Sequence, residues 1–201
     1  MVHKSLICAS SPFFKAACSG TWKESEEKVV RLPEQLPDSF EVYLHMLYTQ
    51  EFDVWGDDKE AFLETCKDRA NGNGTNLFDR MLHHFVLGDV LRDVHFCNKV
   101  VDGLVEAIER LRFIPAGSTI RKHWDNLPSN CTMRRVLIDC AATTAEYEPM
   151  VQLAADYPHG FIIGIALAGI RDRNVAQKDR PFIKRRKCDY HEHISEEDKC
   201  A

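Results

Sequence analysis

The stretch VHKSLICASSPFFKAACSG, residues 2–20, decides the fold because it holds three short elements in immediate succession. Residues 2–4 have the composition of a strand end. After them, apolar residues recur every three or four positions, which is typical of a helix. Ser10, Ser11 and Pro12 then interrupt the pattern. Since serine directly before a first-turn proline is a helix-start signal, the sequence predicts one helix ending near Ser10 and another beginning at Pro12.

The next segments predict a second short strand and an amphipathic helix. Residues 29–32 read VVRL and are stopped by Pro33, as a short strand would be. Asp38 and Glu41 have the three-residue spacing of a capping box at a helix start. The helix that follows carries one apolar stripe at i, i+3, i+4, i+7 and i+8. The members of this stripe are Phe40, Tyr43, Leu44, Leu47 and Tyr48.

Val42 and Met46 lie off this stripe and give the same helix a second, partly apolar side. A surface helix with one buried side does not need a second apolar side. We therefore take the second side as a candidate partner-binding face. The alternative is that both sides are buried within a small helical core.

The rest of the chain is predicted to be helical until about residue 170. ANGNGTN, residues 70–76, is expected to be a flexible break, and beyond residue 171 the composition becomes highly charged. The fold class is therefore mostly α with a small residual β-sheet (α+β). Further helices are expected over 59–69, 77–91, 94–112, around 120–124, over 132–145, and in one or two segments that end near 170.

No catalytic or nucleotide-binding motif occurs in the 201 residues. The sequence lacks G-x-x-x-x-G-K-[ST], G-x-G-x-x-G, G-x-S-x-G and H-E-x-x-H. His83 and His84 are adjacent on a predicted helix and point about 100° apart, which is poor geometry for joint catalysis or chelation. We therefore expect a protein that is not an enzyme.

Charge, apolar runs and cysteines limit the partners and the compartment. The formal net charge is -5, so no overall basic field favours nucleic acid. FIIGIALAGI, residues 161–170, is half of the roughly 20 residues that a membrane span needs. No signal-peptide pattern precedes the eight cysteines, several of which lie in amphipathic segments. We expect a reducing compartment, which is the cytoplasm, the nucleus or both.

The C-terminal tail holds a constellation typical of a metal site. CDYHEHISEEDKC supplies Cys188, His191, His193 and Cys200, a ligand set that suits tetrahedral zinc. In an extended segment His191 and His193 point to the same side, as joint ligation requires. The spacing is not that of a standard zinc finger, so a charged tail with two incidental thiols is the alternative. No other cofactor is expected.

A basic run, KDRPFIKRRK at residues 178–187, lies just before that tail. Such runs serve in nuclear import or in nucleic-acid binding. This run carries a single aromatic residue, Phe182. The alternative is a solvated basic segment that balances an acidic domain.

With the opening read in this way, the N-terminal region resembles the BTB/POZ domain, in particular its form in filamentous fungi. The resemblance rests on VHK, SPFF, WKES and VRLP, which begin at residues 2, 11, 22 and 30, and on the helix that follows from Phe40 to Thr49. It continues more loosely over residues 77–110 and so covers about half of the chain. Residues 113–201 look like the extra helical region of fungal members.

The resemblance implies a helical cluster capped by a small sheet and a chain of three parts. These parts are a BTB/POZ-like domain over 1–112, a helical extension over 113–176 and a charged tail over 177–201. By family role, His3 would lie near a strand–helix junction and Ser11 would cap a helix. The fold-determining residues implied by the resemblance are His3, Ser11, Phe14, Phe40 and Leu47.

The resemblance also implies protein partners. Members of the family form homodimers or hetero-oligomers, and many bind a cullin scaffold and recruit substrates to a ubiquitin ligase, while others act in transcriptional control. The helix that matches residues 39–49 is part of the cullin-facing surface of such complexes. We expect the partner to be a cullin scaffold or another BTB chain, and neither nucleic acid nor a membrane. The partner-binding residues would be Val42, His45, Met46 and Tyr48.

One departure from the family pattern concerns the segment before VHK. Family members carry a further strand, D-x-x-I/V-x-V, followed by a tight turn and a phenylalanine. Many animal members also have an earlier helix and strand that build the dimer. Here VHK begins at residue 2. We therefore expect a truncated chain or a strand edge that another chain pairs with, and homodimerisation by the usual route does not follow.

Two hypotheses for the function result. The leading one is a non-enzymatic BTB/POZ-type interaction protein, most concretely a substrate adaptor of a cullin-based ubiquitin ligase. The competing one is a nuclear transcriptional regulator that binds nucleic acid through residues 178–187, with a zinc-ordered tail. Salt dependence separates them, because binding of a basic run to DNA weakens steeply as salt rises.

Overall fold

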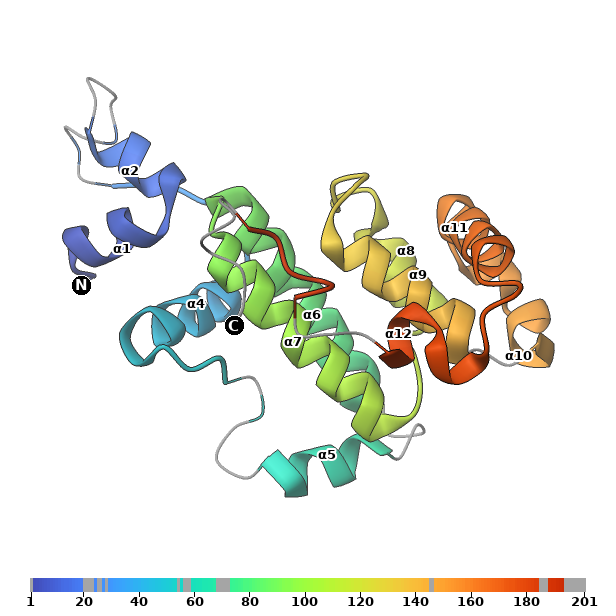
Figure 1. The fold of residues 1–201 in the computed structure, drawn as a ribbon. Coiled ribbons are helices and arrows are strands. Elements are labelled where there is room, and N and C mark those ends of the chain that lie inside the picture. The colour runs from blue at the N-terminus through green and yellow to red at the C-terminus, as the bar shows by residue number, and fades with distance from the viewer. Residues whose placement is uncertain are drawn as a thin grey trace.

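The computed structural model describes residues 2–19, 24, 27, 29–53, 55, 59–67, 73–144, 147–184 and 188–193, without the side chains at 73–75, 147–149 and 184. Every element assigned in this part of the chain is a helix, and no strand occurs in it (Figure 1). The mostly α prediction is therefore confirmed, whereas the small β-sheet is not seen.

The predicted strand end at residues 2–4 is wrong. His3 is the N-cap of a helix that begins at Lys4, and the His3 carbonyl accepts hydrogen bonds from the N–H groups of Leu6 and Ile7 at 3.1 and 3.2 Å. The N–H of His3 donates to the hydroxyl of Tyr48 at 3.1 Å. The backbone groups that a sheet edge would leave open are thus used by a helix start and a side chain.

The predicted strand at residues 29–32 is also wrong. This segment is irregular, and the carbonyl of Leu32 accepts a hydrogen bond from the N–H of Gln35 at 3.1 Å in the turn before the next helix. Neither segment finds an extended neighbour to pair with among the described residues. Since a strand is stabilised by its partner, apolar composition alone did not make one.

Helices α1 (Lys4–Ser10) and α2 (Pro12–Ser19) form a hairpin, and the predicted split before Pro12 is confirmed. Ser11, at the joint, is fully buried. Its Oγ accepts a hydrogen bond from the N–H of Phe14 at 3.2 Å and donates one to the carbonyl of Leu91 at 2.6 Å. The serine therefore caps α2 and ties the hairpin to the end of α6 (Asn73–Leu91).

Helix α4 (Pro37–Thr49) packs on α6, with weaker contact to α1. It begins at Pro37 with Leu36 as N-cap, and no side chain caps it, so the predicted capping box of Asp38 and Glu41 is wrong. The helix ends at Thr49, and its C-cap, Gln50, has a left-handed φ of 63°. Its buried residues are Ser39, Tyr43, Met46 and Leu47.

Helices α6 and α7 (Val94–Leu111) form the central pair of the molecule, with α5 (Lys59–Lys67) across one end (Figure 1). Helix α6 begins at Asn73, inside the segment predicted as a flexible break, and α7 begins at the predicted Val94. The two helices approach closely at Gly88, where a Cβ would lie 2.7 Å from Sγ of Cys97. Because glycine has no Cβ, α6 can approach α7 closely at this position, near the turn that joins the two helices.

The C-terminal helices pack beside this pair, on the side away from α1 and α2 (Figure 1). Helix α9 contacts α7 and α8 contacts α6, while α11 packs closely on α9, with Gly164 against Ile138. No described helix combines the length and the apolar character that crossing a membrane requires. The elements are α8 (Gly117–Trp124), α9 (Thr132–Thr144), α10 (Tyr147–Gln152), η2 (Ala154–Asp156), α11 (His159–Arg171), η3 (Gln177–Asp179) and α12 (Pro181–Lys184).

A buried carboxylate joins the N-terminal helices to the central pair. Asp93 is 2% exposed and caps α7, because its Oδ1 accepts a hydrogen bond from the N–H of Phe96 at 2.9 Å. Its Oδ2 accepts from the hydroxyl of Tyr43 on α4 at 3.0 Å and from the hydroxyl of Ser10 at the end of α1. Burial, and then the Asp93 charge, raise the pKa of Tyr43, so its hydroxyl stays protonated and donates.

Replacing Asp93 by alanine is expected to lower the free energy of unfolding by about 2–4 kcal/mol, because two buried donors and one half-buried donor lose their acceptor. Tyr43→Phe removes one donor and is expected to cost about 1 kcal/mol. Urea unfolding followed by circular dichroism measures both losses, with Asp125→Ala at an exposed position as control. A loss for Asp93→Ala that equals the control would contradict this role.

His84 is a second buried polar residue, and it titrates far from its usual range. It is 1% exposed, and its Nδ1 is hydrogen-bonded to Oγ of Ser39 at 2.9 Å. Burial, with smaller effects from Arg80 and His83, lowers its pKa to about 3. The unfolded chain therefore binds a proton between pH 6.5 and 3 that the folded chain does not.

We expect His84 to make the fold less stable as pH falls below about 6.5, by roughly 1.4 kcal/mol per pH unit. His84→Gln keeps a hydrogen-bonding group without this titration, so it should flatten the pH profile of unfolding between pH 6.5 and 5. Urea unfolding at several pH values measures the difference between the two chains. Parallel profiles for the two chains would contradict the assignment.

Candidate partner-binding surface

The candidate surface lies on α4, whose position is set from both ends. Phe14, Phe40, Tyr43 and Phe96 form a chain of ring contacts, with centroid separations of 6.2, 6.0 and 5.1 Å, that packs α2, α4 and α7 together. Phe14 is 6% exposed and Leu47 3%, whereas Phe40 is half-buried. Of the five residues assigned to the fold from the resemblance, four therefore lie in or against the core: Ser11, Phe14, Phe40 and Leu47.

His3, the fifth of these residues, anchors the other end of α4. Its Nδ1 lies 2.8 Å from the hydroxyl of Tyr48, the same oxygen that accepts a hydrogen bond from the His3 N–H. The two rings meet edge to face with centroids 5.8 Å apart. The start of α1 and the last turn of α4 are therefore joined by one tyrosine hydroxyl.

The four residues assigned to partner binding separate into two groups. His45 is exposed and Tyr48 is 49% exposed, and both lie on the solvent side of α4. Val42 is half-buried and packs against the core. The assignment of Met46 to an exposed face is corrected, because Met46 is 1% exposed. For Met46 the alternative given above is therefore correct: its side of the helix is buried in the core.

Met46 was assigned to the wrong side of α4 because the sequence does not show which side of this helix is buried. The stripe drawn from the sequence correctly included Tyr43 and Leu47, but the buried side of α4 also takes in Met46, which the stripe left out. Apolar residues cover more than half of this helix, so periodicity does not choose between neighbouring stripes. Contact with α6 makes that choice, and α6 is far away in the sequence.

Sequence reasoning missed two features near this surface. Asp93 directly precedes the apolar period of residues 94–111, which is the ordinary signal for an N-cap and was available. A groove of about 510 Å³ also opens beside α2, between Phe13, Ala16 and Val30, with Arg31 and Arg92 at its side. Three separate segments build it, so no local pattern points to it.

The tail residues assigned to zinc are only partly placed. Residues 188–193 lie against α7 and α9: Asn98 exchanges two hydrogen bonds with the backbone of Glu192, at 2.8 and 2.9 Å. Nε2 of His191 lies 2.8 Å from Oδ1 of Asp102, and the His191 and His193 rings are 6.2 Å apart. Cys200 lies outside the described residues, so the zinc site of Cys188, His191, His193 and Cys200 stays a prediction.

Part of the basic run is used in packing. Phe182 is 3% exposed, and Nη1 of Arg180 donates a hydrogen bond to the carbonyl of Ala142 at 3.2 Å. Residues 185–187 lie outside the described residues. The described part of this run therefore contributes to the attachment of the segment that contains α12.

Comparison with known proteins places the N-terminal region in a family. Residues 1–69 match the family model described as BTB/POZ domain. The Kelch-like protein 21 sequences of Rattus norvegicus, Bos taurus and Homo sapiens are each 36% identical to this chain over 64 residues, which is 32% of this chain and 11% of each relative. The match therefore spans about a tenth of the length of these relatives. No solved structure matches the chain significantly. The predicted BTB/POZ resemblance is confirmed for residues 1–69.

Met46→Asp is expected to unfold the chain or to lower its free energy of unfolding by more than about 3 kcal/mol, because it buries an unpaired charge. His45→Asp, at the exposed neighbouring position, is expected to change it by less than about 0.5 kcal/mol. Urea unfolding measures both, and the far-ultraviolet circular dichroism of each variant shows whether it folds. Equal stability of the two variants would contradict the burial of Met46.

Proposed function

We propose that this chain is a BTB/POZ-type protein-interaction module that acts as an adaptor in a cullin-based ubiquitin ligase and uses the solvent side of α4 as part of its docking surface. The observation that carries the proposal is the position of His45 and Tyr48, exposed on the helix that the BTB/POZ resemblance assigns to the cullin-facing surface. The proposal assigns no catalytic step to the chain.

The attachment of α4 at two points supports a docking role. Asp93 holds its middle through Tyr43, and His3 holds its last turn through Tyr48. A surface that is already ordered loses little conformational freedom when a partner binds, so more of the contact energy appears as affinity. Tyr48 is also the kind of residue that interfaces favour, because it combines an apolar ring with a polar tip.

A binding measurement with a purified cullin N-terminal region tests the proposal. We expect the unmodified chain to bind at least one cullin with a dissociation constant of about 1 µM or tighter. Tyr48→Ala is expected to weaken binding by about tenfold or more, because an exposed aromatic residue is a typical hot spot. His45→Ala should weaken it by a smaller factor.

The matched control is His95→Ala, which removes an exposed histidine from α7 instead of α4. This variant is expected to bind the cullin as the unmodified chain does. Circular dichroism of all three variants shows that they remain folded. Binding that is unchanged in Tyr48→Ala and His45→Ala, or absent in the unmodified chain, would contradict the proposal.

A further inference from the structure

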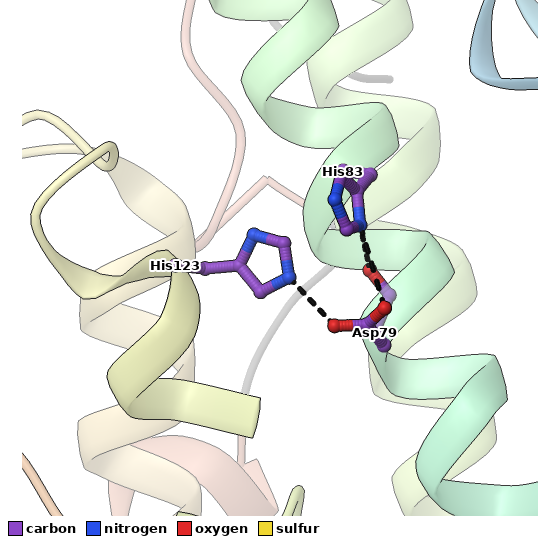
Figure 2. A group of neighbouring side chains, drawn as sticks. All are labelled: Asp79, His83 and His123. Carbon is purple, nitrogen blue, oxygen red and sulfur yellow. Dashed lines mark hydrogen bonds and ion pairs between the residues drawn. The ribbon is translucent and has the colours of Figure 1, made fainter. Parts of the chain in front are cut away.

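Three side chains that could hold a metal ion meet between α6 and α8 (Figure 2). Asp79 and His83 are four residues apart on α6 and therefore lie on the same face of that helix. His123 reaches them from the last turn of α8. One ligand atom from each residue lies within 4.8 Å of the other two.

Hydrogen bonds within the group indicate which ring nitrogens carry hydrogen. Nδ1 of His83 lies 2.9 Å from the backbone carbonyl of Asp79, which is an acceptor, so Nδ1 donates and Nε2 keeps the lone pair of the neutral ring. Nε2 of His123 lies 2.9 Å from Oδ1 of Asp79. A carbonyl bond to the non-ligating nitrogen is the arrangement that orients metal-binding histidines in proteins.

The burial of the group is uneven in a way that suits an ion with one open position. The side chain of His123 is 3% exposed, whereas those of His83 and Asp79 are 23% and 29% exposed. Two of the ligands are therefore partly accessible to solvent, and the third is buried.

We propose that Asp79, His83 and His123 bind a zinc ion, or another divalent first-row transition metal, between α6 and α8, with water in the fourth position. Two imidazoles and a carboxylate with an open position form a ligand set that zinc accepts. On binding, the neutral His123 ring would present its other tautomer: Nε2 gives up the proton that bonds to Asp79, Nδ1 takes one up, and the Nε2 lone pair becomes available to the metal. The bound metal would cross-link the central helix pair to the helical region that begins at α8.

Lys122 is the competitor of this metal. Its Nζ lies 3.0 Å from both carboxylate oxygens of Asp79, and its side chain is 55% exposed. An exposed ammonium of this kind is held weakly and can turn away into solvent. Replacing Lys122 removes its competition for the Asp79 carboxylate, so such a variant should bind the metal more tightly.

Isothermal titration of the full chain with zinc chloride, after treatment with a chelator, tests the proposal. The unmodified chain is expected to bind zinc at this site with a dissociation constant below about 100 µM. His83→Gln is expected to weaken this binding at least about tenfold, since loss of an outer partner alone has an effect of that size. Lys122→Gln is expected to strengthen it by about two- to fivefold.

Two controls separate this site from other causes of binding. His95→Gln, which removes an exposed histidine elsewhere, should bind zinc as the unmodified chain does. Cobalt(II) reports the ligand type, because thiolate ligands add a charge-transfer absorption that imidazole and carboxylate ligands lack. The site predicts a cobalt spectrum without that absorption, and the same spectrum in Cys188→Ser.

The opposite results would overturn the proposal. Zinc affinity that is unchanged in His83→Gln, or lowered in Lys122→Gln, would show that the three residues only bond to one another. A thiolate absorption that disappears in Cys188→Ser together with the zinc binding would place the metal on the tail instead. Gain of affinity in Lys122→Gln cannot result from misfolding, so the pair of variants keeps the test decisive.

Discussion

The carboxylate of Asp93 is the point at which the N-terminal helices and the central pair meet. Ser10 from α1, Tyr43 from α4 and the first turn of α7 all donate hydrogen bonds to it, in a region where Asp93 itself is 2% exposed. A buried acceptor of this kind makes its donors depend on one another, because each would be left unsatisfied without it. Ser11 adds a second link to the end of α6.

This joint has a consequence for the surface of α4. Residues 1–69 match the BTB/POZ family, but Tyr43 and Ser10 find their acceptor beyond that segment, in the turn between α6 and α7. The N-terminal helices are thus completed by the central pair. The solvent side of α4, with His45 and Tyr48, is presented on a support that residues 1–69 do not supply by themselves.

Much of the helical fold was predictable from the sequence, because helix signals are local. Ser11 before Pro12, the apolar period that starts at Val94 and the charged change beyond residue 171 all lie at or near the boundaries of observed elements. The strands predicted at 2–4 and 29–32 do not form, because a strand depends on a partner at a distance that local composition does not reveal. The burial of Met46 depended likewise on α6.

The side-chain groups show the same limit. His83 and His84 do point apart as predicted: His84 bonds to Ser39 in the core, while His83 faces Asp79 and His123. The spacing of Asp79 and His83 on one helix face was visible in the sequence. Their approach to His123, from a helix that begins at Gly117, was not, because only the packing of α8 on α6 brings it about.

The most direct test of docking on α4 is hydrogen–deuterium exchange of the full chain with and without a bound cullin N-terminal region. A partner that docks on α4 is expected to slow exchange in the last turns of α4 and at the start of α1, which Tyr48 and His3 join. Little change is expected over α9 and α11. Protection confined to α9, α11 or the tail, with α4 unchanged, would contradict the assignment of α4 as the docking surface.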